Sequence, residues 1–285
     1  MNILLLLLVT LVWGTTFPLL KSAAATLSGV EISAIRFLIA AVCMLPFAWR
    51  APRQTWRDGA LLGAFALVSY VAQAFGLEHI SSNRSAFLTS LNVLMVPFIG
   101  VLLGGRLALP MVLASVVACA GIGLMSWEGG GNLLGDGATL LCALAYALYV
   151  IVLSQRSARH DSRQLAATQI LLMAGFASVW VGGMGIGGDS LTTLPARLMP
   201  HLGPLLYLGL VATAGMLLLQ AVAQRHVPAD KAAVIYAMEP VFAALFAWVL
   251  LNETLGLRAA LGGAMVVVAV IVSELKPAES PVPAK

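Results

Sequence analysis

Long, nearly uncharged apolar blocks recur along this chain, and they restrict its fold more than any other feature of the sequence. The first block reads NILLLLLVTLVWGTTFPLL, and comparable blocks follow with short polar links between them. Hydrophobic residues make up 60% of the chain and charged residues only 10%. Soluble domains carry about 25% charged residues, and blocks of about 18 or more apolar residues predict membrane-spanning helices. We therefore expect an all-α integral membrane protein.

Ten transmembrane helices are expected from these blocks. They cover residues 3–21, 30–49, 57–76, 84–103, 109–127, 137–154, 165–184, 202–224, 232–251 and 258–275. The links between them leave no room for a separate soluble domain. The proline-rich tail, residues 277–285, is expected to be a disordered cytoplasmic segment.

Lysine and arginine side chains predict the orientation, because basic links stay in the cytoplasm. If the N-terminus is cytoplasmic, eleven basic residues lie on that side and five on or near the other. The eleven are Arg50, Arg53, Arg57, Arg106, Arg156, Arg159, Arg163, Arg225, Lys231, Lys276 and Lys285; the five are Lys21, Arg36, Arg84, Arg197 and Arg258. Both termini of this multi-pass chain are therefore predicted to be cytoplasmic.

Two polar stretches of the chain resemble each other. QAFGLEHISSNRSAF (73–87) and QAVAQRHVPADKAAV (220–234) align without a gap at an offset of 147 residues, which places Gln73 opposite Gln220. Shared polar and basic positions are informative in a chain this apolar. The alignment suggests an internal repeat.

An offset of 133 continues the match upstream, with Trp13 opposite Tyr146 and Arg36 opposite Gln169. The chain then divides into two repeats of five helices, residues 1–130 and 131–276. Because five is odd, the second repeat enters the membrane inverted relative to the first. Inverted repeats with a site near the midplane are typical of secondary transporters.

An acidic residue, Glu239, interrupts the apolar stretch VIYAMEPVFAAL. It lies about 10 Å into the ninth predicted helix, where a charged acid costs at least about 2.5 kcal/mol. Tyr236 shares its helical face, and Thr89 and Asn92 occupy the matching positions of the first repeat. The two pairs predict a central cavity. The alternative is a structural carboxyl, protonated and hydrogen-bonded between helices, with Pro240 starting a kink.

Other polar, aromatic and helix-breaking residues at membrane depth extend the candidate site. The residues expected to line the cavity are Trp13, Thr16, Tyr70, Gln73, Thr89, Asn92, Tyr146, Tyr149, Gln169, Tyr236 and Glu239. Gly14, Pro18, Pro97 and Pro240 are the candidates for bending or gating. Close packing at Gly14 and simple interhelical hydrogen bonds for the polar residues are the competing interpretations.

Arg36 lies about six residues inside the second predicted helix. Its charge could pair with a substrate carboxylate or with an acidic side chain of the protein. The other interpretation is that the side chain snorkels outward to the membrane surface. Gln220 and Gln224, like Tyr70 and Gln73, could line the mouths of a pathway or bond between helices.

Three stretches of the sequence carry a resemblance: QRHVPADKAAVIYAMEPVFAALFAWVLLNETL in the second half, and VWGTTFPLLK and SSNRSAFLTSLNVLMVPFIGVLLGGRL in the first. They resemble the second-repeat signature and its first-repeat counterparts in EamA-type transporters of the drug/metabolite transporter superfamily. The resemblance covers nearly the whole chain. It implies ten helices in two inverted halves and a bacterial inner-membrane exporter of small metabolites, with amino-acid exporters of the YddG type prominent.

The chain departs from the family pattern at the ends of the fourth and ninth predicted helices. LNETL stands where GE-R-L is usual and retains Glu253, whereas LGGRL places Gly105 at the acidic position. Val93 occupies the position that matches Pro240. We therefore expect the first repeat to bend differently from the second.

The expected function is export of amino acids or similar small metabolites by alternating access. Efflux of lipophilic cations, and exchange of sugar phosphates or nucleotide sugars, are the alternatives within transport; a channel or passive scaffold is also left open. The sequence contains no HExxH motif, no P-loop lysine and no CxxC pair, so we expect no enzyme, no cofactor and no metal site. The expected partners are a small-molecule substrate and the lipid bilayer, without nucleic acid. The oligomeric state stays open, and a monomer is compatible with it.

Overall fold

The structure is a computed structural model that describes residues 1–104, 109–126, 132–185, 190–251 and 256–275. All regular elements in these ranges are helical, as predicted. The tail expected to be disordered, residues 277–285, lies outside the described residues, as do Arg106, Gly105 and Glu253.

The helices follow the predicted apolar segments. In chain order they are α1 (Asn2–Gly14), α2 (Thr16–Ala23), α3 (Gly29–Ala48), α4 (Arg53–His79), α5 (Ser82–Ser90), α6 (Asn92–Leu102), α7 (Leu109–Ser126), α8 (Leu133–Arg156), η1 (Ser157–Arg159), α9 (Ser162–Gly185), α10 (Ser190–Leu198), η2 (Met199–His201), α11 (Leu202–Leu206), the π-helix η3 (Tyr207–Gly215), α12 (Met216–Ala223), α13 (Ala229–Tyr236), α14 (Glu239–Leu251) and α15 (Leu257–Leu275).

Seven helices or joined helices in the described part of the chain are long and apolar enough to cross a membrane. The three remaining predicted segments fall on α7, on α13 with α14, and on α15. These are apolar helices that are shorter or interrupted. The chain is thus a multi-pass membrane protein.

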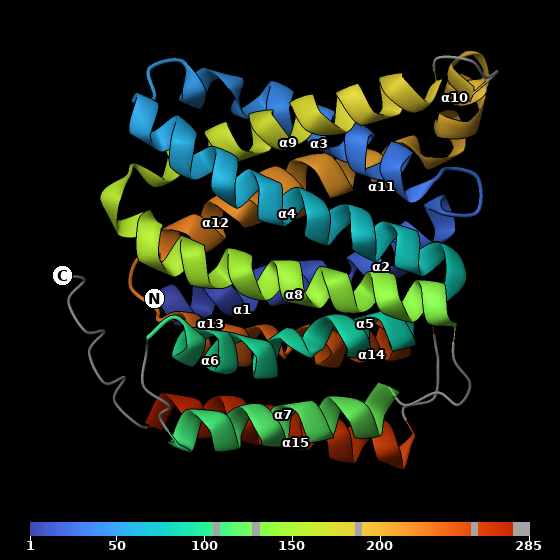
Figure 1. Ribbon diagram of the computed structural model, residues 1–285. Helices are drawn as coiled ribbons and strands as arrows, with labels where there is room; N and C mark the ends of the chain where they lie inside the picture. Colours follow the sequence, from blue (N-terminus) through green and yellow to red (C-terminus); the bar gives the residue numbers. More distant parts are fainter. Residues whose placement is uncertain (105–108, 127–131, 186–189, 252–255, 276–285) are drawn as a thin grey trace.

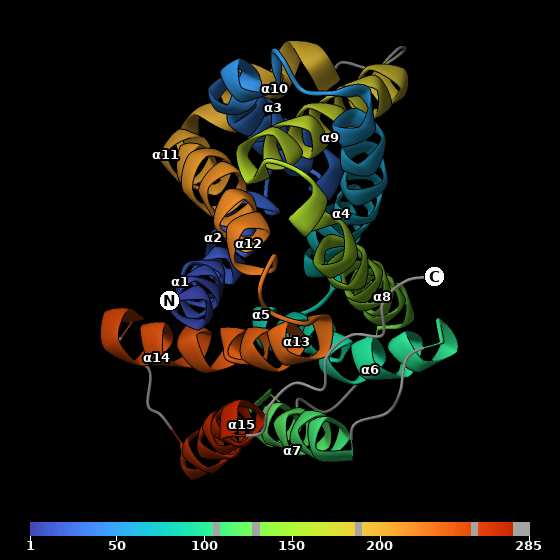
Figure 2. The same ribbon diagram turned by 90° about the vertical axis from the view of Figure 1, so that its left-hand side faces the viewer.

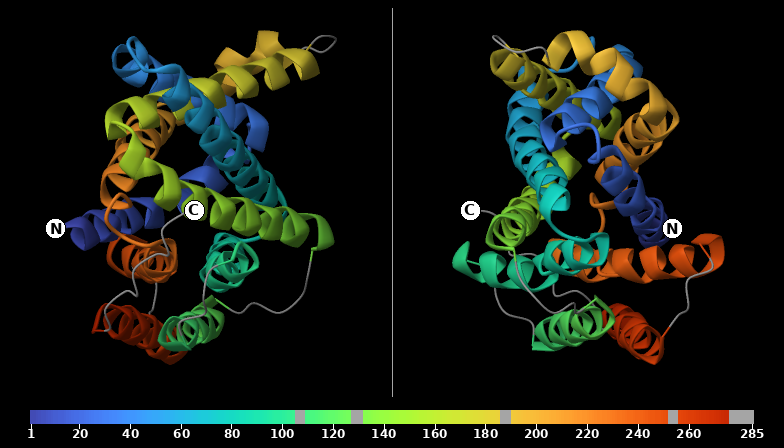
Figure 3. Two further views of the ribbon diagram at one scale, coloured as in Figure 1. Left: turned by 60° about the vertical axis from the view of Figure 1, so that its left-hand side comes forward. Right: turned by 90° about the vertical axis from the view of Figure 1, so that its right-hand side faces the viewer.

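Most helices lie along one direction, and they form layers (Figure 1). Viewed from the end that carries the N-terminus, α3 and α9 lie at the top, with α1 and α12 on one side and α4 and α8 on the other (Figure 2). A layer of α5, α6, α13 and α14 crosses beneath them. Helices α7 and α15 lie side by side below that layer in every view (Figure 3).

Helices of the first half of the chain pack against helices of the second half throughout. Extensive cross-half contacts join α4 with α8 and α9, α3 with α9 and η3, and α7 with α15; smaller ones join α1 with α12 and α6 with α13. Each half therefore buries much of its apolar surface against the other. The region where these pairs meet is the centre of the molecule, and it holds the candidate site.

The α5–α6 and α13–α14 segments are interrupted at matching positions. The α5–α6 segment is interrupted at Leu91, so that α6 begins at Asn92. The α13–α14 segment is interrupted at Ala237–Met238, so that α14 begins at Glu239. Asn92 and Glu239 are separated by the same offset of 147 that relates the polar stretches. The expectation that the first repeat bends differently is wrong in this respect, because both breaks occur without a proline at the break itself.

The prolines expected to bend these segments lie within helices. Helix α6 runs through Pro97, and the break precedes it at Leu91, where the amide Nδ2 of Asn92 donates to the Thr89 carbonyl at 2.7 Å. Pro240 is the second residue of α14, where the missing N–H costs little because first-turn donors have no partner in the helix. Both prolines lie after the breaks; Pro240 lacks the N–H that would bond to the Tyr236 carbonyl, so its part in the second break stays a prediction.

The first predicted helix divides at Thr15 into α1 and α2, close to Gly14 and ahead of Pro18. A Cβ atom at Gly14 would lie 3.1 Å from the Glu239 carbonyl oxygen and 3.0 Å from the Ala243 nitrogen. The missing side chain thus lets α1 approach the start of α14. Close packing, the competing interpretation for Gly14, is present here, and its gating role stays a prediction.

Candidate functional site

Three aromatic rings from separate segments meet at the centre of the molecule. Trp13 of α1, Tyr146 of α8 and Tyr236 of α13 have ring centroids 5.7–5.9 Å apart. All three side chains are more than nine-tenths buried. Edge and tilted contacts of this kind are the favoured arrangements of aromatic pairs. We call these three residues the aromatic cluster.

Glutamine side chains satisfy the tyrosine hydroxyls around the aromatic cluster. Gln220 Nε2 donates to the Tyr146 hydroxyl at 2.9 Å, and the Tyr236 hydroxyl donates to Gln224 Oε1 at 3.1 Å. Both glutamines lie on α12 and are buried. Of the two interpretations left open for them, hydrogen bonding between helices is the one observed in this conformation.

Tyr149 and Gln169 continue the same network. The Tyr149 ring stacks on that of Tyr146 at 5.9 Å, and its hydroxyl is 3.4 Å from Gln169 Oε1, to which it donates. Both side chains are completely buried. Gln169 belongs to α9, so the network joins α8, α9, α12 and α13.

The π-helix η3 forms a hydrogen bond with α1 at the aromatic cluster. The indole Nε1 of Trp13 donates to the Ala212 carbonyl at 2.9 Å. The neighbouring Thr213 donates from its hydroxyl to the carbonyl of Leu208, five residues earlier, at 2.7 Å. π-Helical turns are rare and occur often at functional sites. The sequence carried no signal for Ala212 or Thr213, since VATAG reads as an ordinary apolar helix.

Arg36 points into the bundle. Its side chain is 2% exposed, and Nε donates to the Thr213 hydroxyl at 2.9 Å. The guanidinium carbon lies 4.6 Å from the centre of the Tyr70 ring, over its face. Snorkelling to the surface is therefore excluded in this conformation, and a charge is present near the middle of the protein.

Glu239 is half-buried at the first position of α14. Among the described residues, its carboxyl group makes no hydrogen bond and no ion pair. The backbone carbonyl oxygen of Glu239 would lie 3.1 Å from a Cβ atom at Gly14, the residue after Trp13. The structure thus brings Glu239 to the aromatic cluster but does not show the interhelical hydrogen bond of the competing interpretation.

Three further predicted residues, Gln73, Thr89 and Asn92, form a second polar group. Gln73 Nε2 donates to the Thr89 hydroxyl at 3.4 Å, and the Asn92 side-chain oxygen is buried without a partner. The hydroxyl of Thr16, by contrast, donates to the Trp13 carbonyl of its own helix at 2.8 Å. Thr16 therefore uses its polar atom locally, while Gln73, Thr89 and Asn92 connect α4, α5 and α6.

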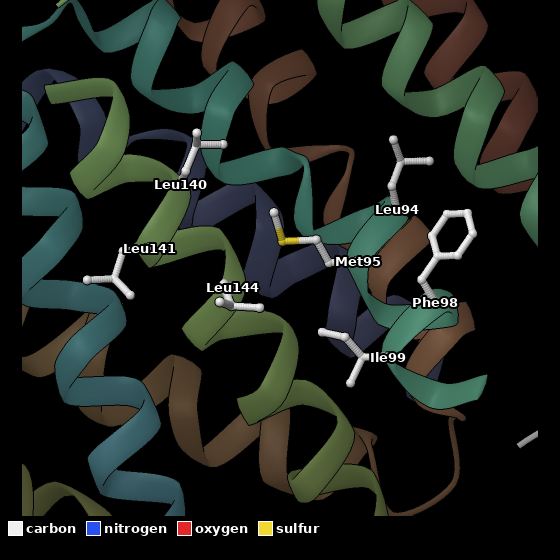
Figure 4. A pocket seen from close by; sticks show the side chains of 7 residues that line it. All are labelled: Leu94, Met95, Phe98, Ile99, Leu140, Leu141 and Leu144. Carbon is white, nitrogen blue, oxygen red and sulfur yellow. The ribbon is translucent and has the colours of Figure 1, made fainter. Parts of the chain in front are cut away.

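The aromatic cluster is buried, and its residues line neither of two pockets found in the described part of the chain. A pocket of about 480 Å³ lies between α6 and α8 (Figure 4). Its lining is entirely apolar: Leu94, Met95, Phe98, Ile99, Leu140, Leu141 and Leu144. An uncharged lining that faces outward suits lipid chains, not a polar substrate. Polar substrates can reach the aromatic cluster only after its side chains separate.

Ion pairs connect the helices at both ends of the bundle. At the end that carries α10, Glu31 pairs with Arg197 at 2.7 Å and Arg84 pairs with Asp136 at 2.6 Å. At the end that carries the N-terminus, Asp58 contacts Arg156 at 3.0 Å and His160 at 2.6 Å. The candidate site thus lies between two groups of interhelical ion pairs.

Known proteins place the chain among transporters. The model of the EamA-like transporter family matches residues 1–127 and 133–275. One relative from Archaeoglobus fulgidus is 29% identical over 94% of this chain and 84% of its own length; another is 23% identical over 96% and 97%. Both are described only as "Uncharacterized transporter".

A solved crystal structure shares the fold. It is 18% identical, with a TM-score of 0.75 over 96% of this chain and 97% of its own. The relatives carry the name transporter, in line with the expectation that this chain is not an enzyme. With both matched stretches together covering most of its length, the chain belongs to the EamA-like transporter family.

Proposed function

We propose that this protein is a secondary transporter that exports amino acids or similar small metabolites across the bacterial inner membrane. It works by alternating access, with the substrate bound in the aromatic cluster between two inverted five-helix repeats, residues 1–130 and 131–276. Both termini are cytoplasmic, so the end that carries α10 faces outward.

The convergence of both halves on one polar and aromatic centre is the observation that carries this proposal. Trp13 comes from the first half, and Tyr146 and Tyr236 come from the second. Arg36 donates to Thr213, the neighbour of the Ala212 carbonyl that accepts from Trp13, and the Glu239 backbone packs against Gly14. Sites near the midplane at a repeat interface are typical of secondary transporters, and the matched helix starts at Asn92 and Glu239 support the repeat.

The polar network also suggests how the site opens. Hydrogen bonds between tyrosines and glutamines keep the empty centre closed, and a substrate with its own donors and acceptors can replace them one for one. The ion pairs at the two ends would then break in alternation. The two pairs at the α10 end are partly exposed, where such contacts contribute little and exchange readily with water. At the opposite end the Asp58–His160 contact is buried, with both side chains 6% exposed.

The two alternative substrate classes, sugar phosphates and lipophilic cations, require binding sites of different charge. Sugar phosphates carry two negative charges and require several basic side chains, whereas Arg36 is the one basic residue among the buried side chains that the structure describes. Lipophilic cations need an acid in an aromatic site, and Glu239, whose backbone packs against Gly14 beside Trp13, meets that need. Cation efflux is therefore the second candidate.

Uptake into proteoliposomes tests the proposal. The purified full chain is reconstituted, and labelled amino acids, a sugar phosphate and a lipophilic cation are offered in turn. We expect saturable flux of one or more amino acids and none of the sugar phosphate. Uptake of the cation alone would favour drug efflux, and flux that does not saturate would favour a channel.

A further inference from the structure

The guanidinium of Arg36 has fewer partners than its chemistry demands. Arginine carries five N–H donors in a planar fork. Only Nε is bonded, to Thr213, and the two η nitrogens have no hydrogen-bond partner among the described residues. The side chain is nevertheless 2% exposed. Buried charges are normally paired, because an uncompensated charge is strongly destabilising.

The hydroxyl of Tyr70 is unsatisfied as well. It is completely buried and has no hydrogen-bond partner. The ring beneath it faces the Arg36 guanidinium at 4.6 Å, so the two groups belong to one site. An unpaired buried hydroxyl costs about 1–3 kcal/mol, a cost that an incoming hydrogen-bonding ligand would remove.

Neighbouring residues hold both groups in place. The Phe37 ring packs edge-on against Tyr70 at a centroid distance of 5.5 Å. Thr213, which accepts from Arg36, is itself fixed by its bond to the Leu208 carbonyl. A Cβ atom at Gly209 would lie 3.0 Å from the Arg36 carbonyl oxygen, so α3 and η3 are in close backbone contact. The orientation of the fork is thus set before any ligand arrives.

The charged groups near the Arg36 guanidinium indicate which class of ligand it would bind. A planar guanidinium matches a carboxylate, with two parallel N–H···O bonds. One arginine suits one negative charge, and the described buried residues supply no second basic side chain. Glu239 makes no ion pair with Arg36 among the residues that the structure describes. The acid therefore stays available for a positive group on the same ligand.

We infer that Arg36 and Tyr70 form the subsite that recognises the carboxylate of the substrate. This inference rests on the proposed function and narrows it to zwitterions with a free carboxylate. Bidentate recognition of this kind rejects amides and esters of the same compound, because they leave the η nitrogens unpaired.

Competition in the transport assay tests the subsite. Uptake of a transported amino acid is measured with the amino acid, its primary amide and its methyl ester as unlabelled inhibitors. Wild type should prefer the carboxylate by at least tenfold. Arg36→Gln should weaken inhibition by the amino acid about 10- to 100-fold and reduce the preference to less than threefold. Arg36→Lys, which keeps the charge but loses the fork, should be intermediate.

Two further variants separate recognition from folding. Tyr70→Phe removes an unpaired hydroxyl, so the empty protein should be as stable as wild type or more stable, while the preference for the carboxylate falls severalfold. A purely structural role would leave that preference unchanged. Arg258→Gln, an exposed basic residue at the start of α15, is the matched control and should behave as wild type.

The possible outcomes separate a failure of the Arg36–Tyr70 subsite from a failure of the proposed substrate class. Amino-acid transport with the same preference in wild type, Arg36→Gln and Arg36→Lys would overturn the subsite and leave the proposed function intact. Thermal stabilisation by simple monocarboxylates, lost in Arg36→Gln but without any amino-acid transport, would support the subsite and overturn the substrate. If no carboxylate binds to wild type, the subsite is wrong.

Discussion

Two segments related by the 147-residue offset differ at the centre of the molecule. Helix α4 runs without interruption from Arg53 to His79, whereas its counterpart contains the π-helix Tyr207–Gly215. At the position where η3 has Thr213, α4 has Ala66, which offers no polar atom. The asymmetry coincides with the two contacts that Trp13 and Arg36 make to η3.

The comparison separates features that both halves share from those that one half has alone. The breaks before Asn92 and Glu239 occur in both halves and follow the common sequence pattern. Among the described residues the π-helix occurs once, at η3. It coincides with tertiary contacts, the hydrogen bonds from Trp13 and Arg36. We conclude that the site is specialised on the η3 side, where Ala212 and Thr213 position an indole and a guanidinium.

Removing the indole should have the largest effect. Trp13→Ala deletes the bond to the Ala212 carbonyl and the contacts with Tyr146 and Tyr236, and a buried tryptophan truncated to alanine costs about 3–5 kcal/mol. We expect a clear loss of thermal stability and loss of transport. Trp180, half-exposed on α9, is the matched control. Equal effects of Trp13→Ala and Trp180→Ala would contradict a special role for the η3 contact.

Replacing the threonine that distinguishes η3 from α4 should have the next largest effect. Thr213→Val keeps the shape but removes the acceptor for Arg36, and hydrogen bonds to charged groups contribute about 1.5–3 kcal/mol. Stability and transport affinity should both fall. Thr139→Val is the control, since Thr139 is equally buried but donates only to the Gly135 carbonyl of its own helix. A Thr213→Val protein as active and stable as Thr139→Val would show that η3 does not position Arg36.

The two ends of the bundle also differ, because the Glu31–Arg197 ion pair has no counterpart at the opposite end. The offsets relate Glu31 and Arg197 to Gln164 and Arg50, which line a pocket of about 540 Å³ at the other end. Glu31→Gln should favour opening at the α10 end, and Gln164→Glu should favour closure at the opposite end, each by about 0.5–1 kcal/mol. Distances between spin labels across each end measure this. Identical distances in both variants and wild type would mean that the pairs do not control opening.

Glu239 and Asn92 occupy matching positions but differ in their ability to bind a proton. Glu239→Gln removes no hydrogen bond in the described structure, so its stability should stay within about 0.5 kcal/mol of wild type, as for most substitutions that remove no contact. If transport is proton-coupled, lowering the pH protonates the glutamate in wild type, whereas the glutamine variant cannot respond. Transport rates measured across a pH series should therefore vary with pH in wild type and be flat in Glu239→Gln. The same pH dependence in both proteins would exclude Glu239 as the proton carrier.

The helical fold was largely predictable, because the length of the apolar blocks and the two similar polar stretches can be recognised in the sequence. Trp13, Tyr146 and Tyr236 were also predictable, since large aromatic and polar residues at membrane depth need buried partners. Thr213 and Ala212 were not, because one is a small residue in an apolar run and the other acts through its backbone. The interruptions at Leu91 and Ala237 were not predicted at these residues. The sequence predicted bends at the nearby prolines, because proline is the clearest local signal for a bend. The exact position of a bend depends on tertiary packing.

Binding of a labelled amino acid to purified Tyr236→Ala protein tests the central site most directly. Tyr207→Ala is the control, because Tyr207 contacts the Thr15 hydroxyl and none of the three rings of the aromatic cluster. We expect wild type and Tyr207→Ala to bind the amino acid with similar affinity, and Tyr236→Ala to bind it at least tenfold more weakly. Unchanged binding in a folded Tyr236→Ala protein would place the substrate outside the aromatic cluster.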